Sequence, residues 1–152
     1  MLPMGIKIII GIIMSLTGYV TARNILGESY QIKKTRIILS IIIVSLPTII
    51  LFQTDYTLIL TTLVYVLTAI SFKYIFDISI VSSILLGGFI MLLTAFSDIL
   101  ITTVETKFFT YYQMRNNIYL NLANNAIVFI MCILITKNNN LVSIIKRFIE
   151  KK

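Results

Sequence analysis

Residues Ile37–Phe52 read IILSIIIVSLPTIILF, a stretch without a single charged side chain. Similar apolar runs recur along the chain, which is 58% hydrophobic and 12% charged and has a mean hydropathy of +0.97. A soluble domain has about 25% charged residues. A water-soluble fold of this length could not hide so much apolar surface. The composition therefore predicts an integral membrane protein.

Only α-helices and closed β-barrels span a bilayer, because every backbone polar group must be paired internally. Barrel strands alternate apolar and polar residues over short segments, whereas the runs here are long and continuous. We therefore predict an all-α membrane protein, a polytopic bundle of about five transmembrane helices with a C-terminal amphipathic basic helix. The predicted spans are Ile6–Ala22, Ile37–Gln53, Tyr56–Phe76, Ser79–Val104 and Asn117–Thr136. The turn Gln53–Asp55 separates the second span from the third.

This pattern divides the chain into a transmembrane bundle, residues 1–137, and a cytoplasmic amphipathic tail or truncated linker, residues 138–152. In the tail, apolar residues recur at helical spacing after the polar break Asn138–Asn140: Leu141, Ile144, Ile145 and Phe148. Two interpretations stay open. The tail either lies on the inner leaflet, attracted by anionic lipid, or begins a helical linker into a further domain.

The basic residues predict the orientation of the spans. On one side of the membrane the predicted spans place Arg23, Lys33, Lys34, Arg36, Lys73, Lys137, Lys146, Arg147, Lys151 and Lys152, and on the other Lys7, Lys107 and Arg115. The richer side is expected inside, which predicts a multi-pass protein of a bacterial cytoplasmic membrane with its N-terminus outside and its C-terminus inside. Because these cations lie between spans and not on one polar face, we exclude nucleic acid as a partner.

The sequence lacks the residues that most catalytic sites use. It has no His, and we find no phosphate-binding loop, zinc-protease motif or nucleophile elbow. The single Cys132 falls inside a predicted span, where a small buried apolar role is expected. The acidic residues are scattered. We predict a protein that is not an enzyme and has no catalytic residue, metal or cofactor.

One ionisable residue, Asp98, lies inside a predicted span, and such residues usually face a bundle interior or a wet cavity. Polar residues of the fourth and fifth spans and the loop between them predict a pocket around it, open to the outside: Thr94, Thr102, Arg115, Asn117, Asn121, Asn124 and Asn125. The alternative is a structural hydrogen-bond network between the two spans. The aromatic loop that holds Phe108, Phe109, Tyr111 and Tyr112 suits the membrane interface or an apolar peptide.

Small residues form two stripes that let helices approach closely. Gly11, Ser15, Gly18 and Ala22 make one in the first span, and Ser83 and Gly87 make another in the fourth. They indicate either a specific dimer face or ordinary packing within one chain.

Residues 23–104 resemble the membrane sensor region of Agr-type histidine kinases, of the GHKL class, from Gram-positive bacteria. The resemblance rests on the basic loop with Asn24–Gly27 and Lys33–Lys34, on Phe72–Ile80, and on Phe96–Leu100, which ends the fourth span. In that family the position of Asp98 is often Glu. Lys152 comes before the dimerisation helix, with its His, and the ATP-binding domain of the family, so the chain is expected to be a fragment, a truncated relic or a stand-alone protein without kinase activity.

The resemblance implies a receptor that senses a secreted peptide from outside and works as a homodimer or with a full-length kinase, in addition to its contact with the lipid bilayer. A second function fits the small size, the basic charge and the lack of catalytic groups equally well. That alternative is a bacteriocin-immunity or transporter-accessory membrane protein. A transport subunit is less favoured, because the inner halves of the predicted spans are too apolar to line a continuous polar path.

Overall fold

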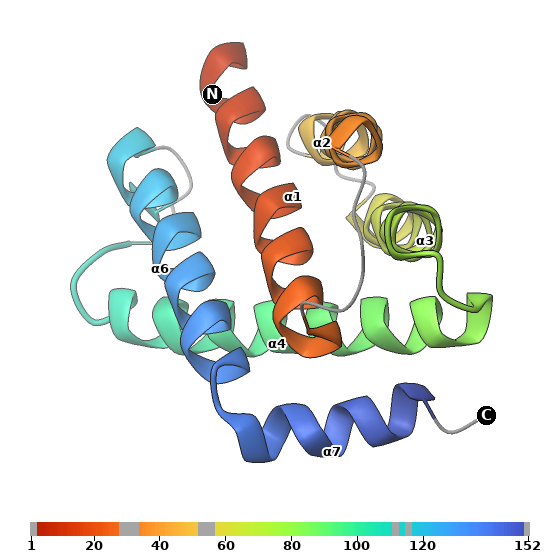
Figure 1. Ribbon diagram of the computed structural model, residues 1–152. Helices are drawn as coiled ribbons and strands as arrows, with labels where there is room; N and C mark the ends of the chain where they lie inside the picture. Colours follow the sequence, from red (N-terminus) through yellow and green to blue (C-terminus); the bar gives the residue numbers. More distant parts are fainter. Residues whose placement is uncertain (1–2, 28–33, 52–56, 111–112, 115–116, 151–152) are drawn as a thin grey trace.

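The computed structural model describes residues 3–27, 34–51, 57–110, 113–114 and 117–150, and within them the secondary structure is entirely helical (Figure 1). The helices are α1 Met4–Leu26, α2 Lys34–Leu51, α3 Thr57–Phe76, α4 Ile80–Glu105, α6 Ile118–Thr136 and α7 Asn139–Glu150. The predicted all-α class is confirmed. The turn Gln53–Asp55, predicted to divide the second and third spans, lies outside the described residues.

Three of the described helices are long and apolar enough to cross a membrane: α1, α4 and α6. Shorter apolar stretches occupy Thr35–Leu46 in α2 and Thr61–Phe76 in α3, so the count of five spans stays a prediction. Large apolar side chains are exposed on the outside of the bundle, such as Leu92 and Ile99 on α4 and Leu134 on α6. Such a surface is compatible with a membrane location, since soluble monomers rarely expose wide apolar patches.

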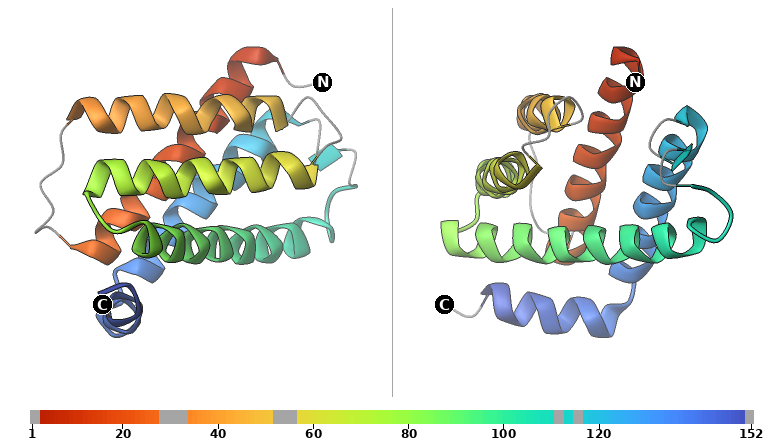
Figure 2. Two further views of the ribbon diagram at one scale, coloured as in Figure 1. Left: turned by 90° about the vertical axis from the view of Figure 1, so that its right-hand side faces the viewer. Right: turned by 180° about the vertical axis from the view of Figure 1, so that it is seen from behind.

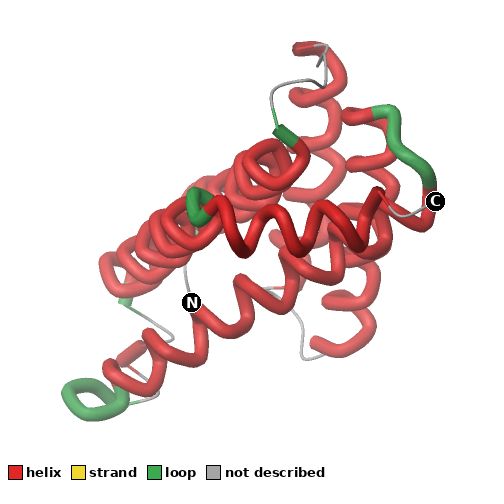
Figure 3. The backbone as a smooth tube through the Cα atoms, turned by 60° about the horizontal axis from the view of Figure 1, so that its bottom comes forward, coloured by secondary structure: helices red, strands yellow, loops and turns green. Residues whose placement is uncertain are grey.

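α2 and α3 lie side by side, and α1 packs against both α2 and α6 (Figure 2). α4 crosses below these helices and contacts α3, α6 and α1. α7 packs on α1, α4 and α6 and lies across the front of the view in Figure 3. Consecutive helices alternate in direction, so the bundle has two ends. At one end, which we call the α7 end, lie the last turns of α1, α3 and α6 and the first turns of α2 and α4. The opposite termini of these helices lie at the other end, which we call the loop end.

The apolar core is concentrated at the α7 end, where four helices meet. It consists of Ala22, Ile25 and Leu26 of α1, Phe72, Ile75 and Phe76 of α3, Leu86 and Ile90 of α4, and Ile149 of α7. Tyr19 stacks on Phe76 with ring centroids 6.0 Å apart. Nearby, the Arg36 guanidinium lies 4.9 Å above the Tyr74 ring and donates a hydrogen bond to the Tyr74 carbonyl. This contact joins the start of α2 to the end of α3.

Both small-residue stripes are buried inside the chain: Gly11, Ser15, Gly18, Ala22, Ser83 and Gly87. A Cβ atom at Gly18 would lie 3.6 Å from the Phe72 ring, and one at Gly87 would lie 3.4 Å from the Tyr65 ring and 3.5 Å from the Ala69 Cβ. The absence of side chains at these positions lets α1 and α4 approach α3. These stripes therefore contribute to packing within one chain.

Polar groups join α1 and α6 near the α7 end. The Asn24 amide donates to the Thr136 hydroxyl at 3.1 Å. One turn further into the bundle, Thr21, Ser97 and Cys132 are completely buried, and the Cys132 thiol lies close to both hydroxyls. Cys132 is thus a buried free thiol.

The contact of Gly87 with α3 predicts the effect of a bulky residue. Gly87→Leu would force α4 away from Tyr65 and lower the free energy of unfolding by about 1–3 kcal/mol, a typical cost of overpacking. Gly5→Leu is the matched control, because nothing lies within 4 Å of a Cβ atom at that position. Thermal unfolding of the purified protein in detergent would measure both. Equal melting temperatures for the two variants would contradict the close α3–α4 contact.

Candidate functional site

An open depression lies on the loop-end half of α4. It has a volume of about 390 Å³ and is lined by Asp98, Ile99, Thr102, Thr103 and Thr106. At helical spacing these residues share one side of α4, and each of them is exposed. The depression is therefore a hollow on the side of one helix and not a pocket enclosed between two.

Local hydrogen bonds form both ends of α4. The Ser79 hydroxyl caps the start of the helix by accepting from the Ser82 amide at 3.1 Å, a usual role for Ser before a helix. At the other end, the Thr106 amide donates to the Thr102 carbonyl at 2.9 Å, and the Phe109 amide donates to the Glu105 carbonyl at 2.8 Å. These turns carry the chain away from α4 and leave the depression open at its edge.

Most hydroxyls around the depression are used by their own helix. Thr103 donates to the Ile99 carbonyl at 2.7 Å, and Thr106 donates to the Thr103 carbonyl at 3.0 Å. By contrast, no described residue forms a hydrogen bond with the Asp98 carboxylate or the Thr102 hydroxyl. The Asp98 carboxylate and the Thr102 hydroxyl lie one turn apart, and both are available to form hydrogen bonds with a ligand. An ionised carboxylate only accepts hydrogen bonds, so this hollow suits a ligand that carries N–H donors or a positive charge.

The asparagines of α6 are engaged mainly in building the loop end. The Asn117 side chain caps α6 by accepting from the Tyr119 and Leu120 amides at 2.9 and 3.2 Å. The Asn121 amide donates to the Met114 and Asn117 carbonyls, both at 2.8 Å, and so ties the preceding loop to the helix.

Asn125 and Asn124 differ in what they contact. The Asn125 side chain donates to the Asn121 carbonyl of its own helix. The Asn124 amide reaches across to α4, where it donates to Glu105 Oε2 at 2.8 Å. The partner of Asn124 is therefore Glu105. Glu105 lies on the same side of α4 as Asp98, two turns closer to the end of that helix.

The predicted site residues thus separate into two groups. Asp98 and Thr102 line the depression, and Thr94, which is half-buried, bonds to the Met91 carbonyl one turn before them. The asparagines form the loop-end network instead, and Arg115 lies outside the described residues. Sequence reasoning missed Ile99, Thr103, Thr106 and Glu105. The spacing of the two threonines from Asp98 is a signal that could have indicated them.

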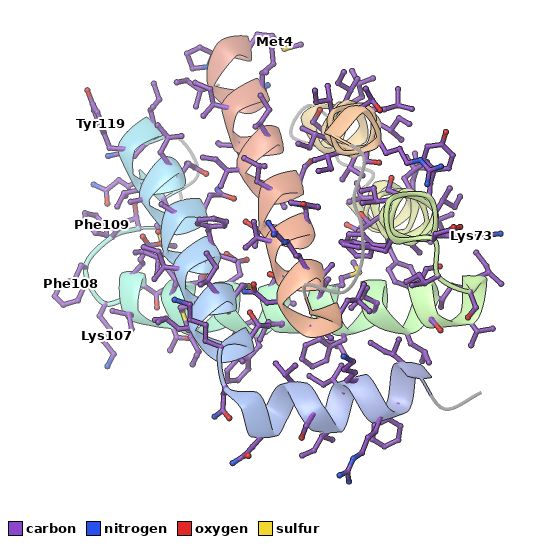
Figure 4. All side chains as sticks on the ribbon, in the orientation of Figure 1. Met4, Lys73, Lys107, Phe108, Phe109 and Tyr119 are labelled. Atoms are coloured by element: carbon purple, nitrogen blue, oxygen red, sulfur yellow. The ribbon has the colours of Figure 1, made fainter. Side chains whose placement is uncertain are left out.

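Exposed aromatic rings surround this end of the molecule. Figure 4 shows Phe108 and Phe109 on the loop after α4, with Tyr119 at the start of α6 on the same edge. Phe108 is 74% exposed and Tyr119 is 82% exposed. Aromatic rings favour the boundary between lipid and water. They also offer an apolar contact surface next to the depression.

A second cavity, enclosed between α1, α2 and α3, is too small for a peptide. Its volume is about 40 Å³, which gives room for a few water molecules at most. The hydroxyls of Ser15, Ser40 and Thr68 line it, and each donates to a carbonyl of its own helix. Among the described residues, no group of three or more His, Cys, Asp or Glu side chains comes together to hold a metal ion.

The bond between Asn124 and Glu105 predicts a measurable link between α4 and α6. Asn124→Leu would remove it and lower the free energy of unfolding by about 0.6 kcal/mol, the average worth of a side-chain hydrogen bond in a membrane protein. Asn125→Leu would cost less, because the Asn125 side chain bonds within its own helix. Unfolding in detergent with increasing SDS would compare them. A larger loss for Asn125→Leu would show that the contact does not hold the two helices together.

The chain was compared with protein-family models, curated proteins and solved structures, and none of them matches it. What the protein does is therefore inferred from its own side chains and their positions.

Proposed function

We propose that the protein is a receptor-like protein of a bacterial cytoplasmic membrane, and that it binds a secreted peptide at the loop end of α4. The observation that carries this proposal is Asp98, an exposed carboxylate with no described hydrogen-bond partner on a helix long and apolar enough to cross a membrane. Ionisable groups in spans are costly and usually functional. A ligand that donates hydrogen bonds to Asp98 and Thr102 would offset that cost.

The chemistry of the loop end favours a peptide over a small ion. The depression of about 390 Å³ is open along the side of α4, so a ligand larger than the hollow can lie across it. Phe108 and Phe109, just beyond the end of α4, supply apolar contacts. A peptide with a cationic or amide-rich face and apolar side chains would use both surfaces. The resemblance to peptide-sensing kinases supports the same class of ligand.

For this function the loop end must face the outside. The distribution of charge supports that orientation. At the α7 end the described charged side chains are Arg23, Arg36, Lys73, Asp77, Lys137, Lys146 and Arg147, an excess of cations. At the loop end they are Lys7, Asp98, Glu105 and Lys107, which balance. We therefore propose that the N-terminus lies outside and the C-terminus inside.

Cysteine labelling in intact cells tests this orientation. In a Cys132→Ser background, a membrane-impermeant maleimide should label Thr106→Cys at the loop end without permeabilisation. It should label Asn138→Cys, before α7, only after the cells are permeabilised. Both positions are exposed. The reverse pattern would place the depression inside the cell and rule out a peptide that binds from outside.

The alternative function is an accessory or immunity protein that binds another membrane protein. One observation favours it: the depression lies on the exposed side of α4, where a helix of a partner could cover Asp98 within the bilayer. Polar side chains do join helices in this way. The two functions differ in what occupies the depression, a peptide from the medium or a transmembrane segment.

Photo-crosslinking from the depression separates these functions. A benzoylphenylalanine at Thr103, in cells exposed to concentrated supernatant of the source bacterium, should capture a peptide-sized adduct that mass spectrometry detects. Asp98→Asn should reduce the yield about tenfold or more, because a hydrogen bond to a charged group contributes about 1.5–3 kcal/mol.

Asp77→Asn is the matched control. It makes the same chemical change at the α7 end, and Asn tolerates the positive φ of 54° at that position. The yield should stay unchanged in this variant. Adducts with a membrane protein alone would favour the accessory function, and adducts with lipid alone would contradict both.

A further inference from the structure

Helix α7 is attached to the bundle along one side. Ile149 is buried in the core between α1, α3 and α4, and Ile145 packs against the same cluster. The Ser82 hydroxyl, at the start of α4, donates to the Ile149 carbonyl at 2.9 Å. α7 is therefore held against the bundle by apolar packing and a hydrogen bond.

A second apolar side of α7 stays open. Ile144 is 56% exposed and Phe148 is 71% exposed. The two residues are four positions apart and form one stripe along the helix. On the helix this stripe lies beside the row of Ile145 and Ile149, so the bundle covers one apolar row of α7 and leaves the other open. Arg147, which is also exposed, lies on the far side of the stripe from the bundle.

Two features on the same end indicate what covers this stripe. The first is the apolar outside of α4 at the same end, since Val81 and Leu85 are exposed one residue before and three residues after Ser82, which holds α7. The second is charge. Among the described side chains of the α7 end, six cations stand against the single acid Asp77. An apolar stripe on a helix with an adjacent cation, Arg147, at an end rich in cations is the kind of surface that inserts at the headgroup level of a bilayer and attracts anionic lipid.

We propose that α7 is an interfacial helix whose open stripe, Ile144 and Phe148, enters the leaflet at the α7 end, and that Arg147 binds the phosphate of an anionic phospholipid there. One side of the helix is then held by protein and the other by lipid. This inference goes beyond peptide binding and does not depend on it, because it concerns the opposite end of the molecule.

The natural chain has no Trp, so Phe148→Trp introduces a unique fluorescent probe. In nanodiscs that contain the full chain, lipids brominated on their acyl chains should quench this indole, and acrylamide in the water should not. Brominated phosphatidylglycerol should quench about fivefold more effectively per molecule than brominated phosphatidylcholine, the preference expected from one cation at the surface. Ser143→Trp, at an exposed position on the polar side of α7, should show the opposite accessibility.

Two further variants isolate the headgroup contact. Arg147→Gln, combined with Phe148→Trp, should reduce the lipid preference to about one and leave quenching by the acyl chains in place. Lys73→Gln, which removes an exposed cation on α3 at the same end, should leave the preference unchanged.

Three outcomes would overturn the proposal. Strong acrylamide quenching of the Phe148→Trp protein would show that the stripe is exposed to water and does not enter the leaflet. Protection from both quenchers would show that protein covers the stripe, such as a second copy of the chain. Equal quenching by both brominated lipids in the protein that keeps Arg147 would contradict the proposed contact between Arg147 and an anionic headgroup.

Discussion

The structure depends on how hydroxyl groups are paired inside apolar helices. Ser15, Thr17, Ser40, Thr68 and Ser97 each donate to a backbone carbonyl four residues earlier. An unpaired hydroxyl in an apolar medium costs several kcal/mol, and this local bond removes the cost without a second helix. These residues consequently act as small packing surfaces. The described side-chain hydrogen bonds that join the long helices include those of Asn24, Arg36, Tyr65 and Asn124.

Against this background, Asp98 and Thr102 stand out. Their neighbours on α4 follow the rule, since Thr94, Ser97 and Thr103 bond within the helix. A carboxylate cannot do the same, because it has no proton to donate to a carbonyl. Asp98 therefore needs a donor from outside α4. Asn124 comes from α6 on this side of the helix, but its amide is taken by Glu105. Asp98 itself is exposed on the side of α4 and lines the open depression.

Helices could be predicted from the sequence because long apolar runs without alternation are typical of helices, which pair their own backbone groups, and the length of each run shows where a helix lies. The burial of Gly18 and Gly87 could also be predicted from the sequence, because small residues at helical spacing indicate close packing. The pairing of Asn124 with Glu105 could not, because it depends on how far α6 is shifted along α4. The sequence left open a pocket shared by Asp98 and the asparagines or a hydrogen-bond network between the two spans. In the structure Asn117 caps α6, Asn121 and Asn125 donate to backbone carbonyls, and Asn124 donates to Glu105.

α4 is the helix common to both ends of the molecule. Its last two turns line the depression, and its first turn holds α7 through Ser82. A continuous helix of 26 residues transmits a tilt or a shift from one end to the other, but coupling also requires an element with two arrangements. The structure shows α7 in one arrangement, in which the bundle buries Ile149 and leaves Phe148 open. Because α4 lines the depression at one end and contacts α7 through Ser82 at the other, a displacement of α4 along its axis would also displace the contact that positions Ile149.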